Sequence, residues 1–542
     1  MRYLLIFLTS LFISTLFQSF LIEYAVAFGF VDIPEPRKLH TIAIPRIGGI
    51  GMVIGAGLAL ILWIHLSHDT EIFLLGIGCL SVFGVLDDRY NLHYLKKLFG
   101  QFVAVSIVVS YGNVLIKNIS IFGLYSIPDV FAYPMTVIFL LGTTNAMNLS
   151  DGLDGLAAGL SLLSIAFIAY LAMLADGKII LAICAAIAGS TFGFLRYNTH
   201  PAEAFMGDTG SQFLGFSIGI LAVSVTNEIN TALSSILPLF IIGFPVTDTL
   251  RVIVERILRK VSPFQAELNH FHHKLLAIGF GHYESVLLIY IIQVIFIYLA
   301  YLLRYQSDIL NILAYVILLV LICCVFPIAN YFKWRWRNFP IKKQTASAIN
   351  KNWVIIQLSA ENIVYIILSC LLSVFTLFGV ALNPVPEFDI GLLTGAILCV
   401  WILSIILKSR YLDFIQRISM YCCVTLSVYG IGTIEVIRPD IAQYFDYIIA
   451  LIAVFIVFCI TLSRIQFSIT PSDYLVMFML IAYISLPSYE SINYATLTTE
   501  AAIALYSLEY SLKNKRIGLV IIITGCMLAL LVATAQSCIS IS

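Results

Sequence analysis

The feature that most constrains this chain is a long series of apolar stretches, each long enough to cross a lipid bilayer as a helix. A helix that spans the hydrocarbon core needs about 20 predominantly apolar residues. Hydrophobic residues make up 61% of the 542 residues and charged residues 11%. Soluble domains are about 45–50% apolar and about 25% charged, so this chain cannot cover a surface in water. The sequence therefore predicts an all-α, polytopic integral membrane protein.

The apolar stretches fall into two sets. Eleven spans are predicted in the first 332 residues, near 3–25, 48–66, 71–87, 98–115, 131–148, 156–175, 178–196, 210–226, 233–257, 284–304 and 310–332. Six or seven follow, near 353–381, 391–407, 418–435, 444–463, 472–487, 517–537 and, interrupted by two glutamates, 490–511. We expect a first membrane domain at 1–332, a basic linker at 333–352 and a membrane extension at 353–542.

Charge and cysteine content exclude some classes of protein. Thirty basic and 30 acidic residues give a net charge of +0, so no overall field attracts nucleic acid, and no nucleic-acid partner is expected. The eleven cysteines form no CxxC pair and mostly lie in apolar stretches, which indicates buried, reduced thiols.

The basic residues are distributed unevenly among the connections between spans. Seventeen lie in connections that the span order puts on one side, at 30–47, 88–97, 149–155, 196–209, 251–283 and 333–343. The alternate connections up to residue 310 hold three. Because cytoplasmic loops are enriched in lysine and arginine, the first set is predicted to be cytoplasmic and the N-terminus to lie outside.

Acids, carboxamides and histidines gather at the predicted cytoplasmic ends of the spans, although such groups are costly at membrane depth. They occur in four motifs: DDRYNLHYLKKLFGQ (87–101), NAMNLSDGLDGL (145–156), FMGDTGS (205–211) and HFHHK (270–274). One further acid, Asp248, lies within the ninth predicted span. The concentration of these groups at one face predicts an active site there.

The residue types indicate the chemistry. Converging carboxylates and carboxamides form an oxygen site that suits Mg²⁺, with Mn²⁺ as the alternative. Histidines and lysines beside such a metal can bind a pyrophosphate. Cytoplasm supplies soluble phosphorylated metabolites and the bilayer supplies a lipid, so the motifs favour transfer between a nucleotide-linked donor and a lipid phosphate.

Each motif also has a structural explanation. The DG pairs at 151–155 are typical of turns, HFHHK of a surface loop, and Asp87-Asp88 of a solvated helix end. The glycines at 48–57 favour helix packing, with Gly48 and Gly49 kept as candidates for ligand contact. The occurrence of all the acidic motifs at one face favours the functional explanation.

Two other classes of membrane protein remain as alternatives. A secondary transporter also uses intramembrane acids, but it places them near the midplane, often within repeated halves. An intramembrane aspartyl protease is the other, since Gly207-Asp208 is a glycine–aspartate pair. Position 205 is Phe rather than Gly, and no convincing partner aspartate follows in an apolar helix, which argues against the protease.

Six motifs taken in order identify a family. They are PRIGG (45–49), DDRYNLHYLKKLFGQ (87–101), NAMNLSDGLDGL (145–156), RYNTHPAEAFMGDTGS (196–211), GFPVTD (243–248) and SPFQAELNHFHHK (262–274). Over about residues 1–332 the chain resembles the polyprenyl-phosphate N-acetylhexosamine-1-phosphate transferases. The branch it resembles is the undecaprenyl-phosphate GlcNAc-1-phosphate transferases that begin O-antigen (lipopolysaccharide), enterobacterial common antigen or teichoic acid linkage synthesis. The resemblance does not extend to 353–542.

The resemblance implies a reaction and a place in the cell. A UDP-N-acetylhexosamine, expected to be UDP-GlcNAc, would donate the sugar-1-phosphate to undecaprenyl phosphate, and UMP would leave. The protein would lie in the bacterial inner (cytoplasmic) membrane with its active site on the cytoplasmic face. Residues 353–542 would stabilise a homodimer or bind a partner of the same pathway.

The resemblance also implies roles for individual residues. Asp208 would be the principal Mg²⁺ ligand with Asn148 as a second, and Asp87, Asp88 and Asp151 would form the catalytic and metal-supporting carboxylates. Substrate would be bound by the other motif residues: Arg46, Lys97, Asn145, Asp154, Asn198, Phe205, His270, His272 and His273. Among these, Asp154 would bond to uracil, Phe205 would stack on it, and the histidines would contact the sugar pyrophosphate.

The chain departs from the family pattern in the loop expected to read the sugar. Close relatives usually carry Asp-Arg where this chain has Glu267-Leu268, and Arg where it has Lys274. Lysine keeps the charge but loses the bidentate guanidinium fork. We expect these changes to leave the reaction intact, while the sequence does not determine which N-acetylhexosamine is transferred.

Overall fold

The computed structural model describes most of the first 332 residues and part of the remainder. The described residues are 2–32, 43–119, 125–260, 269–332, 351–381, 388–406, 412–437, 439–462, most of 500–508, and 517–539. The predicted span 472–487, most of 490–511, the linker except its last two residues, and Glu267-Leu268 lie outside this set.

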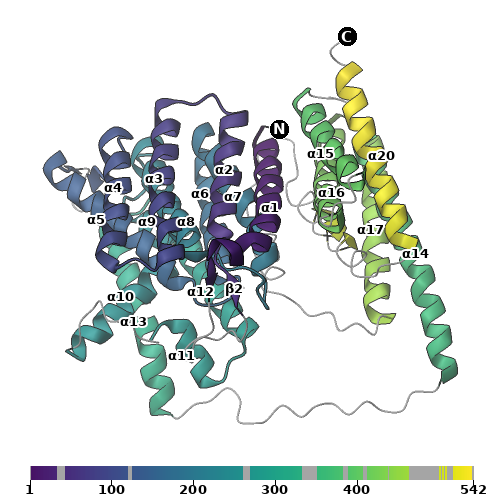
Figure 1. Ribbon diagram of the computed structural model, residues 1–542. Coiled ribbons are helices and arrows are strands. Elements are labelled where there is room, and N and C mark those ends of the chain that lie inside the picture. Colours follow the sequence, from purple (N-terminus) through teal and green to yellow (C-terminus); the bar gives the residue numbers. More distant parts are fainter. Residues whose placement is uncertain are drawn as a thin grey trace. The chain divides into compact units, whose positions relative to one another are not determined.

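Helices make up nearly all of the first part (Figure 1). The elements up to the tenth helix are α1 (Arg2–Phe28), β1 (Val31–Asp32), β2 (Ile44–Pro45), α2 (Gly48–Trp63), α3 (His68–Tyr90), α4 (Tyr94–Tyr111), β3 (Asn118–Ile119), β4 (Tyr125–Ser126), α5 (Asp129–Ser150), α6 (Leu156–Leu174), α7 (Lys178–Asn198), α8 (Gly207–Ser224), the π-helical η1 (Val225–Ile229), α9 (Leu237–Ile241) and α10 (Gly243–Leu258). The next three are α11 (Phe271–Ile278), α12 (His282–Leu303) and α13 (Asp308–Tyr331). β1 pairs with β2 and β3 with β4, both antiparallel.

The prediction of a polytopic, all-α membrane protein is confirmed. Ten of the described helices are long and apolar enough to cross a membrane. The structure differs from the prediction at 233–257, where α9 and α10 replace one continuous span. Pro245 accounts for the break, because proline lacks the amide hydrogen that would bond to the Ile241 carbonyl in a continuous helix. The hydrophilic segment after α10 also forms a short helix, α11, that was not predicted.

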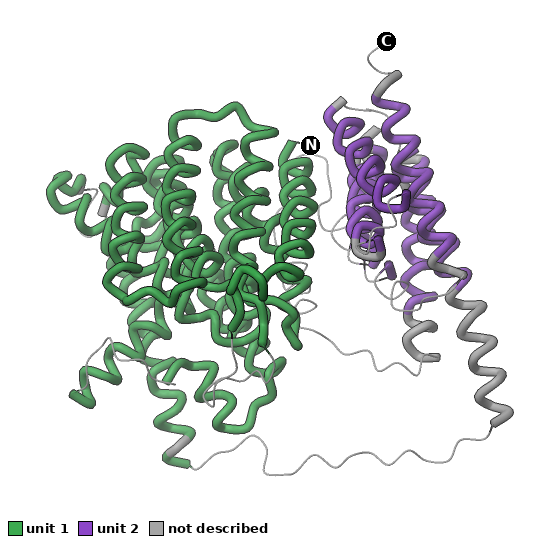
Figure 2. Tube along the Cα trace, viewed as in Figure 1, with its two compact units in different colours: residues 1–340, 470–475 green, residues 341–469, 476–542 purple. Residues whose placement is uncertain are grey.

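The described residues divide into two compact units, one up to Phe332 and one from Lys351 onward (Figure 2). The second unit contains α14 (Lys351–Ala381), α15 (Phe388–Ile406), α16 (Leu412–Ile437), α17 (Pro439–Leu462) and α20 (Ile517–Ile539). In this unit α14 packs against α16, α17 and α20, and α15 packs against α16 and α20. Phe375 of α14 and Trp401 of α15 are fully buried. Its helices fill the apolar stretches predicted there from 353 to 463 and at 517–537.

Helix α8 forms the centre of the first unit. It packs against α2, α3, α5 and α6, and the apolar window of Gly207–Ile229 is entirely buried. A Cβ atom on Gly49 would lie 2.1 Å from the backbone nitrogen of Gly210, so glycine is required for α2 to approach α8 this closely. Gly49 therefore serves helix packing rather than the ligand contact considered from the sequence.

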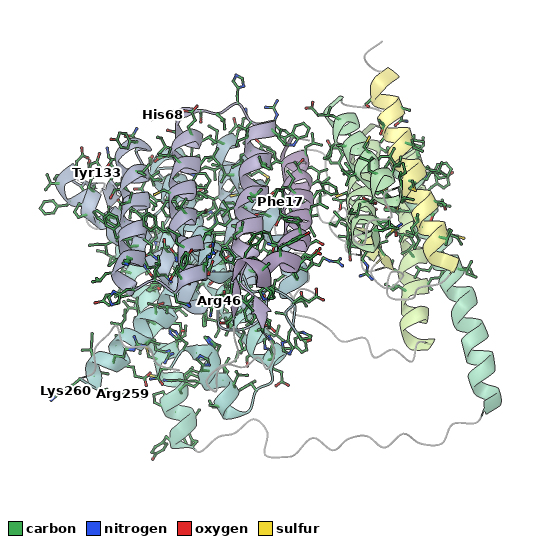
Figure 3. All side chains as sticks on the ribbon, viewed as in Figure 1. Phe17, Arg46, His68, Tyr133, Arg259 and Lys260 are labelled. Atoms are coloured by element: carbon green, nitrogen blue, oxygen red, sulfur yellow. The ribbon has the colours of Figure 1, made fainter. Side chains whose placement is uncertain are left out.

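The two ends of the first unit differ in chemistry. Figure 3 places His68, at the start of α3, near one end, and Arg46, Arg259 and Lys260 toward the other. Because α3 runs from His68 to Tyr90, its Asp87-Asp88 pair lies toward the end that carries these basic residues. The helix termini that bear the polar motifs meet at this end.

Candidate active site

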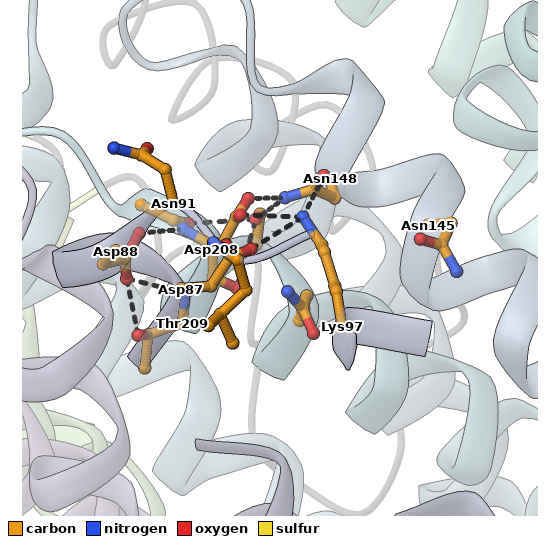
Figure 4. Close-up of polar contacts among 12 residues, drawn as sticks. Asp87, Asp88, Asn91, Lys97, Asn145, Asn148, Asp208 and Thr209 are labelled. Atoms are coloured by element: carbon orange, nitrogen blue, oxygen red, sulfur yellow. Dashed lines mark hydrogen bonds and ion pairs between the residues drawn. The ribbon is translucent and has the colours of Figure 1, made fainter. Parts of the chain in front are cut away.

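Five side chains from four helix ends form an acidic centre (Figure 4). They are Asp87 and Asp88 at the end of α3, Lys97 in the first turn of α4, Asn148 in the last turn of α5, and Asp208 in the first turn of α8. Tight packing of α8 against α3 and α5 brings these termini together. The structure thus assembles residues that are up to 121 positions apart in the sequence.

The Lys97 ammonium lies where three oxygens of the acidic centre converge. Its Nζ is 2.7 Å from Asp208 Oδ2 and 3.4 Å from Asp87 Oδ2. It also donates to Asn148 Oδ1 at 3.2 Å. One ammonium therefore contacts two carboxylates, so the acidic centre with its three aspartates keeps an excess of negative charge.

Asp88 has a different environment from its neighbour Asp87. Its carboxylate accepts hydrogen bonds from the backbone nitrogens of Asp208 at 2.6 Å and Thr209 at 3.0 Å. The Thr209 hydroxyl donates a third bond at 2.6 Å. A carboxylate at a helix N-terminus satisfies free amide groups and interacts favourably with the helix dipole. Asp88 therefore fixes the start of α8, and with it the backbone of Asp208.

Asp208 is the most accessible carboxylate of the centre, with 29% of its side chain exposed against 7% for Asp87. The Asn148 amide donates to Asp208 Oδ1 and, at 2.7 Å, to the Ser211 hydroxyl. Asp87 accepts from the backbone nitrogen of Leu92 at 2.7 Å. Of the three acids in this centre, Asp208 is thus the one most open to a ligand.

A layer of uncharged amides lies one helical turn below the acidic centre. Gln101, four residues after Lys97, exchanges hydrogen bonds with Asn145 at 2.7 and 3.2 Å and donates to Gln212 at 3.2 Å. Asn145 precedes Asn148 by three residues and Gln212 follows Asp208 by four, so each helix carries both layers on one face. Asn145, predicted to bind substrate, here bonds to Gln101 and to the Leu141 carbonyl.

The acidic centre has the donor chemistry of a magnesium site. Its groups are carboxylates and a carboxamide oxygen, the ligands that Mg²⁺ prefers, and it contains no histidine or thiol. The position of the Lys97 ammonium shows that a cation is accommodated among the Asp208, Asp87 and Asn148 oxygens. The residues therefore fit the metal that the sequence predicts.

The turn at 151–155, here the aspartate turn, adjoins the acidic centre. Burial first, and then the charge of Asp208, raises the pKa of Asp151 to about 7. The charges of Asp154 and Asp88 act in the same direction, so these carboxylates are close enough to interact. Cation binding nearby would favour the ionised form of Asp151.

Asn198 lies beside the aspartate turn, and Phe205 lies beside the PRIGG segment. The buried Asn198 amide accepts from the Gly155 nitrogen at 2.8 Å and donates to the Ala204 carbonyl at 3.0 Å. The Phe205 backbone bridges to Arg46 and donates to the Pro45 carbonyl at 2.8 Å. Asn198 thus ties the aspartate turn to the segment that precedes the FMGDTGS motif, and Phe205 joins that motif to PRIGG.

The Arg46 side chain also has partners within the protein. Its guanidinium bonds to Asp32 and, at 3.3 Å, to Asn91, which follows the end of α3. Arg46 therefore lies at the same end as the acidic centre, where the sequence predicted a substrate contact.

The histidine segment is held by a buried ion pair. Asp248 accepts from Arg251 at 2.8 Å, from the Phe271 nitrogen at 3.1 Å, and lies 3.0 Å from His270 Nδ1. Arg251 also donates to the Asn269 carbonyl at 2.6 Å. Asp248 thereby anchors the start of α11, and His270 contacts this acid.

The other two histidines lie on α11 itself. A Cβ on Gly152 would lie 2.1 Å from His272 Nε2, so α11 packs directly on the aspartate turn. This buried Nε2 has no hydrogen-bond partner among the described residues. Burial, followed by the charge of His273, lowers the pKa of His272 to about 3. Burial, followed by the charge of His270, also lowers the pKa of His273. Both side chains are therefore neutral near pH 7.

Sequence reasoning gave no role to Asp248 or Arg251, nor to His282, which lies near Asp154. Asp248 stands in the GFPVTD motif, and an acid within an apolar span was itself a signal that it needs a partner. His282 lies at the start of α12, and its sequence context carries no comparable signal.

Replacing Asp248 with Asn is expected to destabilise the protein by about 3–5 kcal/mol, because the Arg251 charge loses its fully buried partner and keeps only the more exposed Glu255. Side-chain exposures of 3% and 4% place this pair away from water. Glu255→Gln is the matched control, since Glu255 also contacts Arg251 but is 22% exposed. Thermal unfolding in detergent should show a much larger loss for Asp248→Asn, and equal losses would contradict the anchoring role.

Comparison with known proteins places the chain in a family. Residues 71–226 match the family described as Glycosyl transferase family 4. A Bacillus subtilis protein, described as a probable undecaprenyl-phosphate N-acetylglucosaminyl 1-phosphate transferase, is 35% identical over 345 residues, covering 62% of this chain and 95% of the relative. The chain belongs to the polyprenyl-phosphate N-acetylhexosamine-1-phosphate transferase family. The resemblance drawn from the six motifs is thereby confirmed.

Two other relatives from this family are more distant. A decaprenyl-phosphate N-acetylglucosaminephosphotransferase of Mycolicibacterium smegmatis is 34% identical, covering 49% of this chain and 73% of the relative. An undecaprenyl-phosphate alpha-N-acetylglucosaminyl 1-phosphate transferase of Escherichia coli K12 is 28% identical, covering 51% of this chain and 77% of the relative. The chain is thus a multi-pass membrane transferase that is longer than the part these relatives match.

Proposed function

We propose that this transferase moves N-acetylglucosamine-1-phosphate from UDP-GlcNAc to undecaprenyl phosphate. A lipid phosphate oxygen forms a bond to the phosphorus that bears the sugar, and the bond from that phosphorus to the bridging oxygen breaks. The products are undecaprenyl-pyrophosphoryl-GlcNAc and UMP. The observation that carries the proposal is the acidic centre at one end of an apolar bundle, where a lipid phosphate and a soluble nucleotide can meet.

Within this proposal Mg²⁺ would be held by Asp208 and Asn148, the two groups that share a hydrogen bond beside Lys97. When bound there, it would supply positive charge that stabilises the negative charge of the pyrophosphate. Asp87 orients the lipid phosphate and accepts its proton, and the Lys97 ammonium moves from the carboxylates to phosphate oxygens. Asp88 keeps Asp208 in place, and the nearby Asp151 carboxyl supports the charge balance.

The nucleotide and sugar occupy the neighbouring segments. Asp154 accepts the uracil N–H, Phe205 stacks on the base, and Asn198 holds the backbone around both. The neutral His272 and His273 contact the pyrophosphate or sugar through ring N–H groups, and the unpartnered Nε2 of His272 supports this role. Arg46, Asn145 and His270 act by orienting these segments.

The proposed setting is the inner membrane of a bacterium, with the acidic centre on the cytoplasmic face. The excess of basic residues in the connections on that side supports this orientation. The product would begin a cell-surface polysaccharide such as O-antigen or a teichoic acid linkage unit. Residues 353–542 would form a homodimer contact or bind a partner of the same pathway.

The deciding experiment uses the full chain purified in detergent. Undecaprenyl phosphate, Mg²⁺ and separate UDP-sugars, including UDP-GlcNAc and UDP-GalNAc, are supplied, and UMP and the lipid product are measured by mass spectrometry. Product of the mass of undecaprenyl-pyrophosphoryl-GlcNAc, lost on chelation, supports the proposal. Solute flux without UMP release would indicate a transporter, and peptide cleavage without magnesium would indicate a protease.

Phe205→Ala is expected to raise the KM for UDP-GlcNAc more than it lowers kcat, because base stacking is similar in the ground and transition states. Stacking contributes about 1–3 kcal/mol per base, which corresponds to roughly fivefold to a hundredfold in KM. Phe131→Ala, an exposed ring at the other end of α5, is the control and should leave both constants unchanged. A changed KM for the lipid with an unchanged nucleotide KM would refute the stacking role.

A further inference from the structure

Three side chains from separate segments converge beside the aspartate turn. Asp154 belongs to the turn, His200 follows α7, and His282 is the first residue of α12. One possible ligand atom from each lies within 4.8 Å of the other two. The imidazole rings of His200 and His282 stack, with centroids 3.9 Å apart and planes inclined by 17°. These three residues are called the imidazole cluster below.

Direct hydrogen bonds hold the cluster together. His200 Nδ1 lies 2.6 Å from Asp154 Oδ2, and His282 Nε2 lies 3.2 Å from the Asp154 backbone oxygen. The Ala202 nitrogen donates to the same carboxylate oxygen at 3.2 Å. Both imidazoles therefore approach Asp154 from different segments, and all three side chains are only half-buried, so a solute ion can reach them.

The backbone around the cluster is fixed by longer-range contacts. The Tyr283 hydroxyl donates to the His200 carbonyl at 2.9 Å, which ties the segment after α7 to the start of α12. The Tyr290 hydroxyl donates to the Gly155 carbonyl at 2.8 Å, and Asn198 bonds to the Gly155 nitrogen. Three ligand-bearing segments are thus positioned before any ion arrives, which is what a metal site requires of its supporting residues.

The donor set differs from that of the acidic centre. Two imidazoles and one carboxylate suit zinc and similar first-row transition ions, whereas Mg²⁺ prefers oxygen ligands alone. Zinc bonds of about 2.0–2.1 Å place tetrahedral ligand atoms about 3.3 Å apart. The ligand atoms of the cluster lie within 4.8 Å of one another, and small side-chain rotations bring them to the spacing that zinc requires. Three protein ligands leave a fourth position for water or another ligand.

We propose that Asp154, His200 and His282 bind a zinc-class divalent ion, at a site chemically separate from the acidic centre. A bound ion takes the Asp154 carboxylate oxygen that otherwise faces His200. This step rests on the proposed function, in which Asp154 accepts the uracil N–H. An ion bound at the imidazole cluster then competes with the UDP-sugar for Asp154. The transferase is thereby inhibited by zinc even when magnesium is abundant.

Metal retention tests the site without any substrate. The full chain, purified in detergent without a polyhistidine tag and stripped with a chelator, is incubated with Zn²⁺ and desalted in the presence of excess Mg²⁺. Elemental mass spectrometry should find one zinc per chain in the wild type and much less in His200→Gln and His282→Gln. His68→Gln removes an exposed histidine at the other end of the first unit and should retain the ion (Figure 3).

Co²⁺ provides an independent readout of ligand geometry. The wild type should develop the visible absorption of a four-coordinate cobalt ion, and the two cluster variants should lose it. Thermal unfolding in detergent verifies that both variants are folded, and His200→Asn provides a second replacement at that position. Equal zinc retention in the wild type and in all folded variants, without a four-coordinate cobalt spectrum, would overturn the site and indicate adventitious binding only.

The competition is measured separately. Zn²⁺ should raise the apparent KM for UDP-GlcNAc severalfold at fixed Mg²⁺, and His282→Gln should require at least about tenfold more zinc for the same effect. Zinc that binds at the cluster without changing this KM would overturn the competition. Zinc that binds specifically to a chain that releases no UMP would instead refute the proposed function and leave the metal site standing.

Discussion

Asp208→Asn is expected to reduce UMP release by at least about a thousandfold. Bridging a carboxylate to a pyrophosphate through a metal stabilises developing charge by several kcal/mol, and about 4 kcal/mol corresponds to a thousandfold in rate. Asparagine keeps the size of the side chain and one oxygen but removes the charge. The fold should survive, because Asp88 contacts the backbone of Asp208 and not its side chain.

The measurement is turnover across a range of Mg²⁺ concentrations, with thermal unfolding as the check on folding. Asp176→Asn makes the same chemical change at a position where 81% of the side chain is exposed, and it should behave as wild type. A folded Asp208→Asn protein that retains more than about a tenth of wild-type turnover at saturating Mg²⁺ would contradict the assignment. A tenfold loss of rate means that the carboxylate stabilises the transition state by only about 1.4 kcal/mol.

The helices and the gathering of the motifs were predictable from the sequence. Apolar stretches of about 20 residues have no stable alternative to a helix in lipid, so each described stretch predicted as a span is helical, with one interruption in α9–α10. The uneven basic residues put the polar motifs at one end, and the structure brings Asp87, Lys97, Asn148 and Asp208 into one centre. Hydrophobicity and the distribution of basic residues therefore place the residues of the acidic centre at one end, and helix packing brings them into contact.

The partners of individual side chains were not predictable. The pairing of Asp248 with His270, and of Asp154 with His200, depends on how separate segments pack, which the periodicity of a single helix does not encode. His282 lies close to Asp154 although 128 residues separate the two in sequence. Such contacts are set by tertiary packing of α11 and α12 against the aspartate turn.

The sequence also could not distinguish the roles of Asp87 and Asp88. Consecutive residues on a helix point about 100° apart, so adjacent acids face different neighbours. Asp87 faces Lys97, whereas Asp88 faces the first amide groups of α8. The structure therefore separates one acid that adjoins the ligand region from one that supports the helix carrying Asp208.

Asp88→Asn is the second replacement expected to have a large effect, through position rather than through direct chemistry. Both carboxylate oxygens of Asp88 accept hydrogen bonds, whereas asparagine has only one oxygen that can accept. At least one donor therefore loses its bond: the Asp208 nitrogen, the Thr209 nitrogen or the Thr209 hydroxyl. The favourable interaction of a negative charge with the start of α8 is also lost. A shift of about 1 Å in a catalytic group can cost about a hundredfold in rate.

Turnover should therefore fall by about a hundredfold in Asp88→Asn, and the Mg²⁺ concentration for half-maximal activity should rise. Thr209→Val provides a graded comparison, because it removes only the hydroxyl bond and keeps both backbone bonds to Asp88. We expect its Mg²⁺ requirement to lie between those of the wild type and Asp88→Asn. If Asp88 were instead the reacting base, Asp88→Asn would abolish turnover with an unchanged Mg²⁺ requirement and Thr209→Val would be nearly silent. That result would contradict the positioning role. If Asp88 positions α8, its loss must displace Asp208 and so weaken the binding of the metal there.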